Sequence, residues 1–386
     1  MRSAVQADSI AALREIAKRR LPQPVFDFMD GGADEEITLR ANLEHLRQVE
    51  FRPRYLRDVA VRDSVIDILG VPADLPLIIA PTGLAALGWP AADVLLARAA
   101  AKRRLPFVIS TSSSVRMEEI AAAAEGARLW FQVYIYKDRE LVRSLISRAA
   151  NCGVDALVLT VDTPVLGWRR RDHANQFTVP LRPTLNMVLE FARCWRWTLD
   201  IAVSGVPKMQ NFVERGGSND VASLASLMTS NMDATVSWSD LAWLRDLWPG
   251  KLIIKGLSSA PDAEEAVRQG VDAVWVSNHG GRQLDGARSA ISALPAIVDA
   301  VDGRAEVYMD GGVRKGGDIA KAVALGARAA AVGRATLFGV SAGGQTGADQ
   351  ALSILSTEFD RCLALMGSAS ANELDCSFVQ IPPSWR

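Results

Sequence analysis

Short apolar runs alternate with amphipathic stretches along most of the chain, from residue 75 onward. The apolar runs predict eight strands, at 75–81, 105–110, 129–134, 156–162, 252–256, 273–278, 306–312 and 329–334. Apolar residues at helical spacing predict helices between them, at 91–103, 116–124, 138–150, 259–269, 289–301 and 317–326. Strands that are apolar throughout are buried on both faces, which is typical of a parallel sheet. The alternation therefore predicts an α/β protein built from right-handed strand–helix–strand units.

Eight such units favour a single closed (β/α)8 barrel, the TIM barrel, over an open doubly wound sheet. The open sheet is the alternative, but no G-x-G-x-x-G sequence follows the first predicted strand. Ahead of the barrel we expect an N-terminal helical segment, with one helix at 8–20, which Pro22 and Pro24 end, and another at 36–47. Between them, the residues VFDFMDGGADEE (25–36) are interpreted as an aromatic turn.

One interval breaks the rhythm of the barrel, because about 90 residues separate the fourth predicted strand from the fifth. We expect an inserted segment, roughly 177–236, within a single domain that spans 1–386. Its first part predicts an amphipathic helix whose apolar face carries Leu185, Val188, Leu189, Ala192 and Trp195. Its second part, 214–231, is rich in small polar residues and is interpreted as a mobile loop, and a helix at 239–248 leads back to the barrel.

Composition and charge exclude several classes of protein. Lys and Arg number 43 and Asp and Glu 44, so the net charge of −1 gives no chain-wide basic field for binding nucleic acid. Four widely separated cysteines without a C-x-x-C pair indicate neither a disulfide framework nor a zinc site, so no metal is expected. No signal peptide is recognised, and no apolar stretch of about 18 residues predicts a transmembrane helix. We therefore expect a cytoplasmic protein in a reducing environment.

Polar and titratable residues follow six consecutive predicted strands, at their carboxyl ends. They are Gln132 and Tyr134, Thr160 and Asp162, Lys255, then Ser277, Asn278, His279 and Arg282, then Asp310, Gly311, Gly312 and Arg314, and finally Gly333 and Arg334. The carboxyl ends of all strands of a barrel meet at one rim, where active sites lie, so these side chains are expected to converge. A single one could be a structural cap, but six strand ends in succession favour an active site.

Glycines mark the ends of the last two strands, with Gly311 and Gly312 after the seventh and Gly333 followed by Arg334 after the eighth. Each pair leads into a helix, whose N-terminus carries positive potential, and glycines let backbone N–H groups approach an anion. Arg334 adds a bidentate guanidinium clamp. The alternative is that both pairs are tight turns, but their pairing at these two strands favours a phosphate site.

His279 is the preferred general base among the three histidines, since an imidazole titrates near neutral pH and this one follows a strand. Asp162, at another strand end, is placed to orient the ring and to stabilise its protonated form. His45 is interpreted as a surface or packing residue, and His173 as a residue that orders the loop after the fourth strand.

Cationic side chains near the same rim indicate how an acidic ligand binds. Arg169 and Arg282 could grip a carboxylate, whereas Arg170 and Arg171 are interpreted as solvated or lipid-facing. Lys255 has two interpretations. It is either the Schiff-base nucleophile of an aldolase or isomerase, or a cation that stabilises negative charge developing on a bound cofactor.

Four segments resemble the FMN-dependent L-2-hydroxy-acid dehydrogenase and oxidase family. They are FQVYIYKDR (131–139), LTVDTPVLGWRRRD (159–172), SNHGGRQLDG (277–286) and MDGGVRKGGDIAKAVALGA...VGR (309–334). The resemblance extends from about residue 8 to about residue 370, and the run around His279 is highly specific. Because of the long insert after the fourth strand, the chain looks most like the membrane-associated (S)-mandelate and L-lactate dehydrogenases of this family.

The resemblance implies FMN as cofactor and six residues at the reacting centre. It implies that His279 is the base, that Asp162 is its partner, and that Tyr134 contacts the substrate hydroxyl and its developing charge. It implies that Arg169 and Arg282 bind the substrate carboxylate, and that Lys255 lies beside the flavin N1–C2=O edge. It implies isoalloxazine and ribityl contacts at Pro81, Thr82, Gly83, Ser110, Gln132, Thr160 and Ser277. It implies phosphate contacts at Asp310, Gly311, Gly312, Arg314, Gly333 and Arg334.

Three positions discriminate within the family pattern. Phe28 stands where the family usually has a tyrosine whose hydroxyl helps to hold the substrate carboxylate, a hydrogen bond to a charged group worth about 1.5–3 kcal/mol. Ser112 stands where the short-chain glycolate oxidases carry a bulky tryptophan, and with Phe28 it favours an aryl or longer 2-hydroxy acid. Gly83 resembles the dehydrogenases, whereas the oxidases more often have alanine there, which favours a quinone or cytochrome acceptor over oxygen.

The resemblance therefore implies oxidation of an L-(S)-2-hydroxy acid, mandelate- or lactate-like, to the 2-oxo acid, with electrons passing from reduced FMN to a membrane quinone or cytochrome. It also implies a homotetramer. The alternatives are an oxidase of the same family that uses oxygen and releases hydrogen peroxide, a Schiff-base aldolase or isomerase, and a non-catalytic barrel that binds a phosphate ligand.

The stretch Leu166–Trp197 is basic and aromatic in a chain whose net charge is −1. It carries six arginines against two acidic residues, a local charge of +4, together with Trp168, Phe191, Trp195 and Trp197. Its apolar helical part, about 15 residues, is too short to span a bilayer but suits a helix lying among headgroups. We expect 177–236 to bind an anionic membrane surface, at the inner face of the cell membrane. The alternative is a lid helix packed on the barrel mouth.

Overall fold

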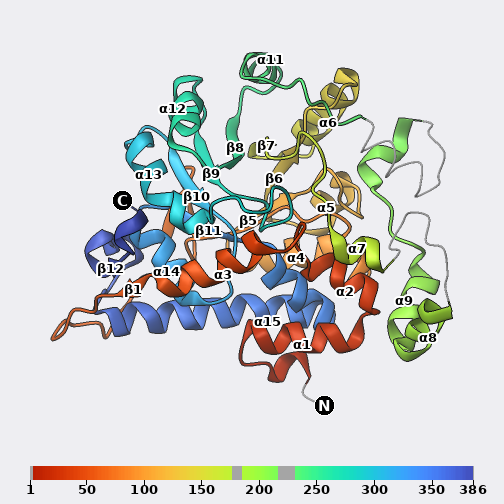
Figure 1. The fold of residues 1–386 in the computed structure, drawn as a ribbon, viewed down its shortest axis with the longest axis horizontal. Helices are drawn as coiled ribbons and strands as arrows, with labels where there is room; N and C mark the ends of the chain where they lie inside the picture. The colour runs from red at the N-terminus through yellow and green to blue at the C-terminus, as the bar shows by residue number, and fades with distance from the viewer. Residues whose placement is uncertain (1–2, 176–184, 216–230, 386) are drawn as a thin grey trace.

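The computed structural model describes residues 3–175, 185–215 and 231–385, and its centre is a closed barrel of parallel strands (Figure 1). The barrel strands are β4 (Leu77–Ile79), β5 (Pro106–Ile109), β6 (Arg128–Val133), β7 (Ala156–Thr160), β8 (Lys251–Leu257), β9 (Ala273–Val276), β10 (Glu306–Met309) and β11 (Ala329–Val332). Each strand pairs with the next along the chain, and β11 closes the barrel on β4. The predicted (β/α)8 barrel and all eight of its predicted strands are confirmed.

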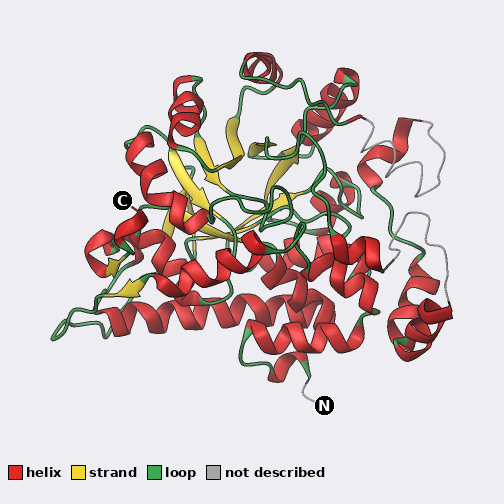
Figure 2. Cartoon of the chain, in the orientation of Figure 1, coloured by secondary structure: helices red, strands yellow, loops and turns green. Residues whose placement is uncertain are grey.

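Helices surround the barrel on its outside (Figure 2). They are α4 (Ala92–Ala101), α5 (Met117–Ala123), α6 (Arg139–Asn151), α11 (Ser239–Leu247), α12 (Ala260–Arg268), α13 (Ala290–Val301), α14 (Gly316–Ala324) and α15 (Arg334–Met366). The seven that the periodicity predicts differ from their predicted ranges by at most two residues at either end. Three of them begin where a side chain accepts a backbone N–H as N-cap, at Asp138, Ser259 and Ser289.

The N-terminal segment contains η1 (Ala4–Gln6), α1 (Ile10–Arg20), α2 (Gln23–Asp30) and α3 (Ile37–Gln48). The helices expected at 8–20 and 36–47 are confirmed, but the interpretation of 25–36 as a turn is wrong, because its first half is the end of α2. Pro22 ends α1 and is also the N-cap of α2, and Pro24 lies in the first turn of α2, where a proline lacks no needed hydrogen bond.

An aromatic layer fills the barrel interior. Trp130, Trp275 and Tyr308 are fully buried, and the Tyr308 ring lies 5.8 Å from the Trp130 ring and 5.9 Å from the Trp275 ring. The ammonium group of Lys255 lies over Trp275, 5.7 Å from the ring centroid. Lys255 therefore packs on this aromatic layer, and its ammonium group lies on the side of the layer that faces the carboxyl ends of the strands.

A small antiparallel hairpin, β2 (Ile66–Ile68) and β3 (Val71–Ala73), lies against the amino ends of the barrel strands. Glu306, the first residue of β10, accepts hydrogen bonds from the Leu69 backbone at 2.9 Å and from the Tyr308 hydroxyl at 2.7 Å. Arg128 at the start of β6 donates to the Ile68 carbonyl. The hairpin therefore closes the end of the barrel opposite to the rim where the site is expected.

Between β7 and β8 the structure describes α7 (Arg170–Ala174), α8 (Leu185–Arg193), α9 (Trp195–Ser204) and η3 (Gln210–Arg215) ahead of α11. The single amphipathic helix expected there is two helices, which meet at Cys194. Figure 1 shows α8 and α9 beside the barrel, away from its axis. Most of the predicted loop 214–231 lies outside the described residues. Within the described ranges, no helix has the length and hydrophobicity that crossing a membrane requires.

Short elements join the two ends of the chain. β1 (Glu50–Phe51), which follows α3, pairs antiparallel with β12 (Val379–Gln380) near the C-terminus. The remaining short helices are η2 (Ala85–Leu87) after β4 and η4 (Ala371–Glu373), η5 (Cys376–Phe378) and η6 (Pro383–Trp385) around β12. The long helix α15 bends at Gly343 and Gly344 and packs against α1 and α4. The N-terminal helices are therefore held against the barrel by the last part of the chain.

Candidate active site

His279 and Asp162 lie together at the carboxyl rim of the barrel, although 117 residues separate them along the chain. His279 Nδ1 lies 2.9 Å from Asp162 Oδ1. Burial alone would raise the pKa of Asp162, but the neighbouring His279 and Lys255 outweigh burial and lower this pKa to about 2. An ionised carboxylate can only accept, so Nδ1 carries the proton and Nε2 keeps the lone pair. The pair can therefore take up a proton at Nε2 and stabilise the resulting imidazolium.

The turn that carries His279 has an unusual backbone. His279 adopts a left-handed conformation with a φ of 58°, and Gly281 has a φ of 76°. Ser277 Oγ accepts from the backbone N–H of His279 at 3.0 Å, and Asn278 Oδ1 accepts from that of Gly281 at 3.0 Å. A Cβ at Gly281 would lie 2.6 Å from the backbone nitrogen of Leu39. The S-N-H-G-G sequence is thus what allows the turn to direct the imidazole into the rim.

A reciprocal pair of amides fastens this turn to α3. Asn42 Nδ2 donates to Asn278 Oδ1 at 2.8 Å, and Asn278 Nδ2 donates to Asn42 Oδ1 at 2.9 Å, with both side chains buried. A Cβ at Gly311 would meet the Asn42 side chain at 3.2 Å, and one at Gly312 would meet its carbonyl at 2.3 Å. Asn42 therefore contacts both the base-bearing turn and the glycine loop after β10. Sequence patterns do not single it out, because a lone polar residue in an amphipathic helix is ordinarily exposed.

Lys255 is buried at β8 and held as a cation. Its Nζ donates to Ser277 Oγ at 2.9 Å and lies 3.3 Å from Asp310 Oδ2, and Ser277 donates to Asp310 Oδ1 at 2.7 Å. An ammonium group in these contacts has no free lone pair, which disfavours the Schiff-base alternative. The side chain of Asp310, a residue expected among the phosphate contacts, is the counter-ion of Lys255.

Two arginines flank the Phe28 ring at the mouth of the site. The guanidinium carbons of Arg169 and Arg282 lie 5.4 Å and 5.3 Å from the ring centroid. Burial, together with the charges of Arg169 and Arg334, lowers the pKa of Arg282 well below its ordinary value. A carboxylate placed between the two arginines would stabilise their charged forms, so this part of the rim is suited to an anionic ligand.

Three buried polar atoms at the rim have no hydrogen-bond partner among the described residues, namely Gln132 Nε2, Thr160 Oγ1 and Asp162 Oδ2. Buried polar groups are ordinarily paired, so these atoms indicate a polar ligand that completes their bonds. Burial and the nearby Asp162 raise the pKa of Tyr134, which keeps its phenol protonated as a donor. The donors of Gln132 and Thr160 suit a planar heterocycle with carbonyl and ring-nitrogen acceptors, so the residues present fit the FMN that the resemblance implies.

The turn after β4 and the loop after β5 lie side by side. A Cβ at Gly83 would meet Ser112 Cβ at 3.0 Å and Ser110 Oγ at 3.8 Å, and one at Gly333 would meet Thr82 Cγ2 at 3.4 Å. Ser110 Oγ accepts from the Ser112 backbone N–H at 3.1 Å. The predicted flavin contacts on these three strand ends are therefore brought together on one side of the rim, next to Ser112, the position predicted to affect substrate size.

The predicted anion site lies at the ends of β10 and β11. Gly311 and Gly312 have φ values of 97° and 87°, in the region that favours glycine. Burial and neighbouring arginine charges lower the pKa of Arg314 to about 9 and that of Arg334 to about 10. A phosphate placed here would offset both buried charges, so the arrangement fits the phosphate of FMN.

Some of the N–H donors of Arg334 and Arg282 already bond to backbone carbonyls at the C-terminal end of α2. Arg334 donates to the carbonyls of Met29 and Gly31 at 3.0 Å and 2.7 Å, and Arg282 donates to those of Phe28 and Gly31 at 2.8 Å and 2.9 Å. These carbonyls lie at the negative end of the helix dipole. The bidentate clamp expected of Arg334 is therefore shared between the protein backbone and any phosphate.

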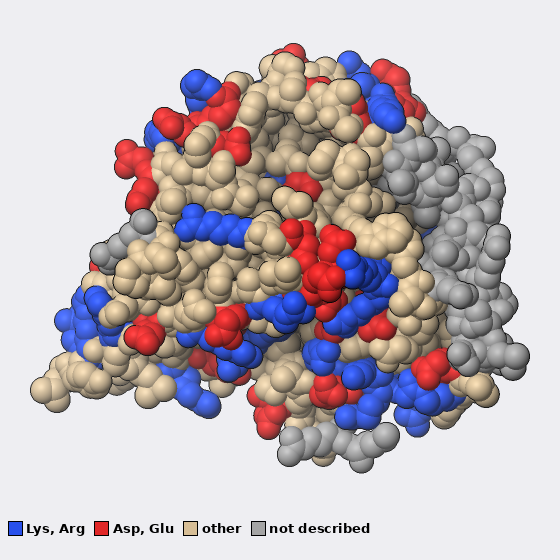
Figure 3. All heavy atoms as spheres, viewed as in Figure 1, with Lys and Arg blue, Asp and Glu red and all other residues tan. Residues whose placement is uncertain are grey.

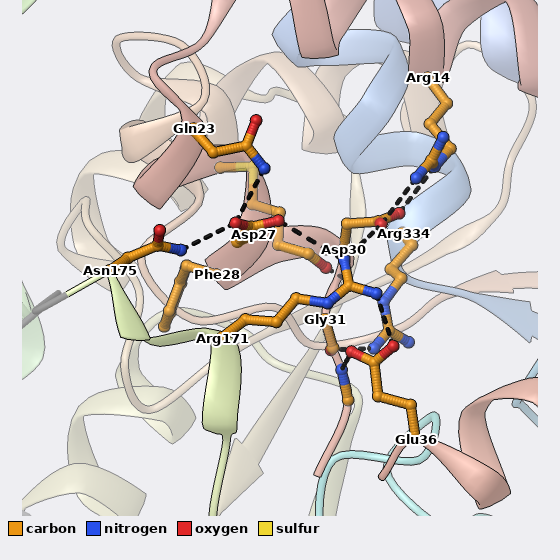
Figure 4. A network of polar contacts seen from close by, with 12 residues as sticks. Arg14, Gln23, Asp27, Phe28, Asp30, Gly31, Glu36, Arg171, Asn175 and Arg334 are labelled. Carbon is orange, nitrogen blue, oxygen red and sulfur yellow. Dashed lines mark hydrogen bonds and ion pairs between the residues drawn. The ribbon is translucent and has the colours of Figure 1, made fainter. Parts of the chain in front are cut away.

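Arg14 and Arg171 approach α2 from other directions (Figure 4). Arg14 makes two bonds of 2.7 Å to Asp30, and Arg171 lies 3.2 Å from Asp30 and pairs with Glu36. Burial alone would raise the pKa of Asp30, but Arg14, Arg334 and Arg171 lower it. The interpretation of Arg171 as solvated or lipid-facing is wrong, since its guanidinium ties α7 to α2 and α3. Figure 3 shows basic and acidic side chains intermingled on this face.

The other two histidines do not reach the rim chemistry. His173 stacks on Trp168, with ring centroids 3.6 Å apart, in the loop after β7 that it was expected to order. His45 Nδ1 lies 2.7 Å from Ser289 Oγ, where α3 meets the start of α13. One contact is a ring stack and the other is a hydrogen bond between helices, both away from the rim, so His279 is the histidine placed for acid–base chemistry.

Comparison with known proteins extends these observations to nearly the whole chain. Residues 17–381 match the family model of the FMN-dependent dehydrogenases. The chain is 42% identical over 370 residues to (S)-mandelate dehydrogenase of Pseudomonas putida, covering 95% of this chain and 92% of that protein. It is 40% identical over 370 residues to L-lactate oxidase of Nostoc sp., covering 95% and 96%. The crystal structure of the monotopic membrane protein (S)-mandelate dehydrogenase matches it with a TM-score of 0.94 and 41% identity, over 97% of this chain and all 100% of that one.

The amide pair generates a prediction about coupling between helix α3 and the site. Asn42→Ala should lower the free energy of unfolding by about 1–3 kcal/mol, because the Asn278 amide then loses a buried partner. It should also weaken FMN binding, because the same residue supports the glycine loop. Thr38→Val is the matched control, since Thr38 is a buried residue of α3 whose hydroxyl bonds to Leu284 and Ala287 and not to the pair. Urea unfolding and FMN titration measure both effects. Equal FMN affinity in the two variants would contradict the role of Asn42.

Proposed function

The chain belongs to the FMN-dependent dehydrogenase family, and from that premise we propose that it oxidises an L-2-hydroxy acid, mandelate- or lactate-like, to the 2-oxo acid. The observation that carries the proposal is the convergence of a base and two carboxylate-binding cations at one rim. His279 has Nε2 free to accept a proton, and Arg169 and Arg282 both lie within 5.4 Å of the Phe28 ring. A 2-hydroxy acid has its carboxylate on the carbon that is oxidised, so it needs a base and a carboxylate-binding cation side by side.

The protein's own groups handle the carboxylate and the proton. Arg169 and Arg282 hold the carboxylate, which directs the hydroxyl-bearing carbon toward the base. His279 takes a proton from the substrate at Nε2, and the ionised Asp162 stabilises the imidazolium. Tyr134, protonated because its pKa is raised, donates to the substrate oxygen as charge develops there. Bound FMN supplies the two-electron acceptor for the carbon that is oxidised.

FMN would be held along the same rim. Gln132 and Thr160 offer unpartnered polar atoms to the ring, and Lys255 offers a buried positive charge to the edge where negative charge collects. Further ring and ribityl contacts are proposed at Pro81, Thr82, Gly83, Ser110 and Ser277, and phosphate contacts at Gly311, Gly312, Arg314, Gly333 and Arg334. A non-catalytic phosphate-binding barrel would account for the glycine loops, but it leaves the His279–Asp162 pair without a purpose.

The substrate is proposed to be an aryl or longer 2-hydroxy acid. Phe28 presents a ring without a hydroxyl to the carboxylate site, so the two arginines carry most of the grip on the anion. Ser112 is small, and its neighbour Gly83 leaves the space beside it unfilled by side chain. Apolar contacts with a larger substituent can replace the missing hydroxyl bond, which favours a mandelate-like acid over lactate.

The electron acceptor is proposed to be a membrane quinone or cytochrome. Gly83 supports this acceptor, since the resemblance associates glycine at this position with dehydrogenases. Relatives at about 40% identity include both dehydrogenases and an oxidase, so oxygen is the second candidate acceptor. Peroxide production under air separates the two.

Helices α8 and α9 support a contact with a membrane surface. Trp195, Leu199 and Val203 recur every four residues on α9 and are 59%, 56% and 83% exposed, and Leu189 on α8 is 66% exposed. An apolar stripe left open in this way is typical of a helix lying in a headgroup layer. A lid helix packed on the barrel mouth would bury this stripe, so the exposure favours the membrane over the lid.

The arginines and aromatic rings of Leu166–Trp197 contribute less to the proposed membrane contact than their number indicates. Most of the described arginines are paired within the protein, Arg169 with Asp172, Arg170 with Glu35, Arg171 with Asp27, Asp30 and Glu36, and Arg193 with Glu190. Trp197 is buried, and its indole N–H donates to the Leu87 carbonyl at 2.7 Å. The apolar stripe is therefore proposed to dominate over electrostatic attraction. Arg182 lies outside the described residues.

We propose that the enzyme acts at the inner face of the cell membrane, where this contact brings its flavin toward a lipid-soluble acceptor. A homotetramer is the proposed assembly. Exposed apolar side chains in the loop between β1 and β2, at Tyr55, Leu56 and Val61, are 80%, 106% and 84% exposed and would be covered by such self-association.

The proposed base is tested by His279→Gln. The variant should retain FMN but reduce it with 2-hydroxy acids about 10²–10⁴-fold more slowly, because general-base loss costs that much. His45→Gln is the control, since His45 lies away from the rim chemistry. Anaerobic stopped-flow reduction of the flavin by mandelate and lactate is the measurement. Rates close to those of the parent would overturn the assignment.

The proposed carboxylate site is tested by Phe28→Tyr. The hydroxyl of a tyrosine at this position, between Arg169 and Arg282, can donate a hydrogen bond to the substrate carboxylate. The affinity for lactate should therefore rise by about tenfold, a gain of about 1.4 kcal/mol. The substrate dependence of flavin reduction reports this affinity. If lactate binds equally or more weakly, Phe28 does not face the carboxylate.

The proposed membrane face is tested by the triple variant Trp195→Ser, Leu199→Ser and Val203→Ser. It should lose flotation with anionic lipid vesicles and keep its rate of flavin reduction, because the stripe lies on the solvent side of α9. Leu365→Ser is the control, an exposed apolar residue elsewhere, which is 73% exposed on α15. Unchanged flotation of the triple variant, or no flotation of the parent protein, would sink the membrane proposal.

A further inference from the structure

The segment between β7 and β8 does not lie wholly outside the barrel. Its part Gln210–Phe212, at the start of η3, passes along the carboxyl rim beside the loop after β5. Asn211 is 1% exposed and Phe212 is 7% exposed, whereas the neighbouring α9 presents an open apolar stripe. A polar side chain as deeply buried as Asn211 must have its hydrogen bonds met within the protein, and its partners show what it supports.

Asn211 spans the loop that joins β5 to α5. Its Nδ2 donates to the carbonyls of Ser110 at 3.2 Å and Thr111 at 3.4 Å, and its Oδ1 accepts from the backbone N–H of Met117 at 3.0 Å. The adjacent backbone N–H of Gln210 donates to the carbonyl of Ser113 at 3.0 Å. One amide therefore joins both ends of this loop, and the backbone beside it holds the middle.

The loop in turn holds Gln132, a proposed flavin contact, through Thr111. The backbone N–H of Thr111 donates to Gln132 Oε1 at 3.2 Å, and the Thr111 hydroxyl donates to the Gln132 carbonyl. Because Oε1 accepts this hydrogen bond, the orientation of the Gln132 amide is fixed, and its unpartnered Nε2 is left to bond to a ligand. Ser110, whose carbonyl Asn211 holds, is the other proposed flavin contact on this side of the rim.

Asn211 is itself held from outside the barrel. Arg148 of α6 donates to the Asn211 carbonyl at 2.9 Å and makes bonds of 2.7 Å and 3.0 Å to Glu118 of α5. The Phe212 ring meets Tyr136 edge-on, with centroids 5.7 Å apart, and Tyr136 meets Tyr134 in the same way at 6.0 Å. These contacts anchor Gln210–Phe212 between two barrel helices and the tyrosine end of β6.

We propose that Asn211 is a positioning residue of the FMN site, acting through Thr111 and Gln132 on the donor that meets the flavin. The segment between β7 and β8 divides ahead of residue 210 into a peripheral pair of helices, α8 and α9, and a strap that belongs to the site. The inference rests on FMN binding and not on the identity of the substrate or of the electron acceptor.

Asn211→Asp tests this role, because the side chain keeps its size and its acceptor for Met117 but loses both N–H donors. FMN released from the diluted holoenzyme is followed by flavin fluorescence, and the visible absorption band of the bound flavin is recorded. We expect the dissociation constant for FMN to rise at least tenfold and the band to shift, because Gln132 is no longer held. Asn211→Ser, which restores one donor, should lie between the parent and the Asp variant, and it decides the question if the Asp variant does not fold.

A matched control separates positioning from general destabilisation. Thr198→Val removes a hydroxyl bond between α8 and α9 and leaves the loop and its supports untouched. It should bind FMN within about twofold of the parent, with an unshifted flavin band. Replacement of α8 and α9 alone by a short Gly/Ser linker should also keep FMN. The proposal is overturned if Asn211→Asp or Asn211→Ser retains parental affinity and spectrum, or if Thr198→Val loses FMN to the same extent.

Discussion

Positive charge buried at the barrel mouth is the constraint on which the rest of the site depends. Arg282 and Arg334 are partly buried, and burial lowers the pKa of each because an uncompensated guanidinium removed from water is costly. Helix α2 compensates part of this charge, because the carbonyls at its C-terminal end accept hydrogen bonds from both arginines. The N-terminal segment is therefore a wall of the site and not a cover placed on a finished barrel. An anionic ligand adds the negative charge that carbonyl dipoles supply only in part, which explains why the rim is suited to carboxylate and phosphate.

The strand-end residues could be predicted because closure of a barrel converts position in the sequence into position in space. His279 and Asp162 are 117 residues apart, yet each follows a strand, so the rule that strand ends share one rim was enough to pair them. Asn42 and Asn211 could not be predicted in this way. Asn42 bonds to Asn278, 236 residues away, and Asn211 bonds to Thr111, 100 residues away. No local sequence pattern encodes contacts of this kind. Helix α2 was missed for a different reason, since a proline that ends one helix is equally suited to begin the next.

The segment after β7 shows why a count of charges does not describe a surface. Its sequence has an excess of arginine, and a basic membrane anchor is the natural expectation. In the folded chain most of those guanidinium groups pair with carboxylates of the N-terminal segment or of their own helices. The apolar stripe of α9 is exposed together with arginines such as Arg170 and Arg193. Pairing within the protein offsets the charge of these arginines, whereas no described residue covers the stripe. Of the apolar face predicted at 185–195, Leu189 and Trp195 are exposed in the structure, whereas Leu199 and Val203 lay outside that prediction.

The contacts that close the mouth join residues far apart in the chain, with 305 residues between Arg334 and Met29. During synthesis on the ribosome, α2 emerges long before β11 and α15 exist to receive it. Pairing of β1 with β12 delays completion further, because β12 lies almost at the C-terminus. The rim is thus the last part of the molecule that can assemble, and the apolar faces of α1 and α2 stay exposed until then. Contacts of such long range form slowly. Building one wall of the site from the first residues translated therefore leaves apolar surface uncovered for most of synthesis.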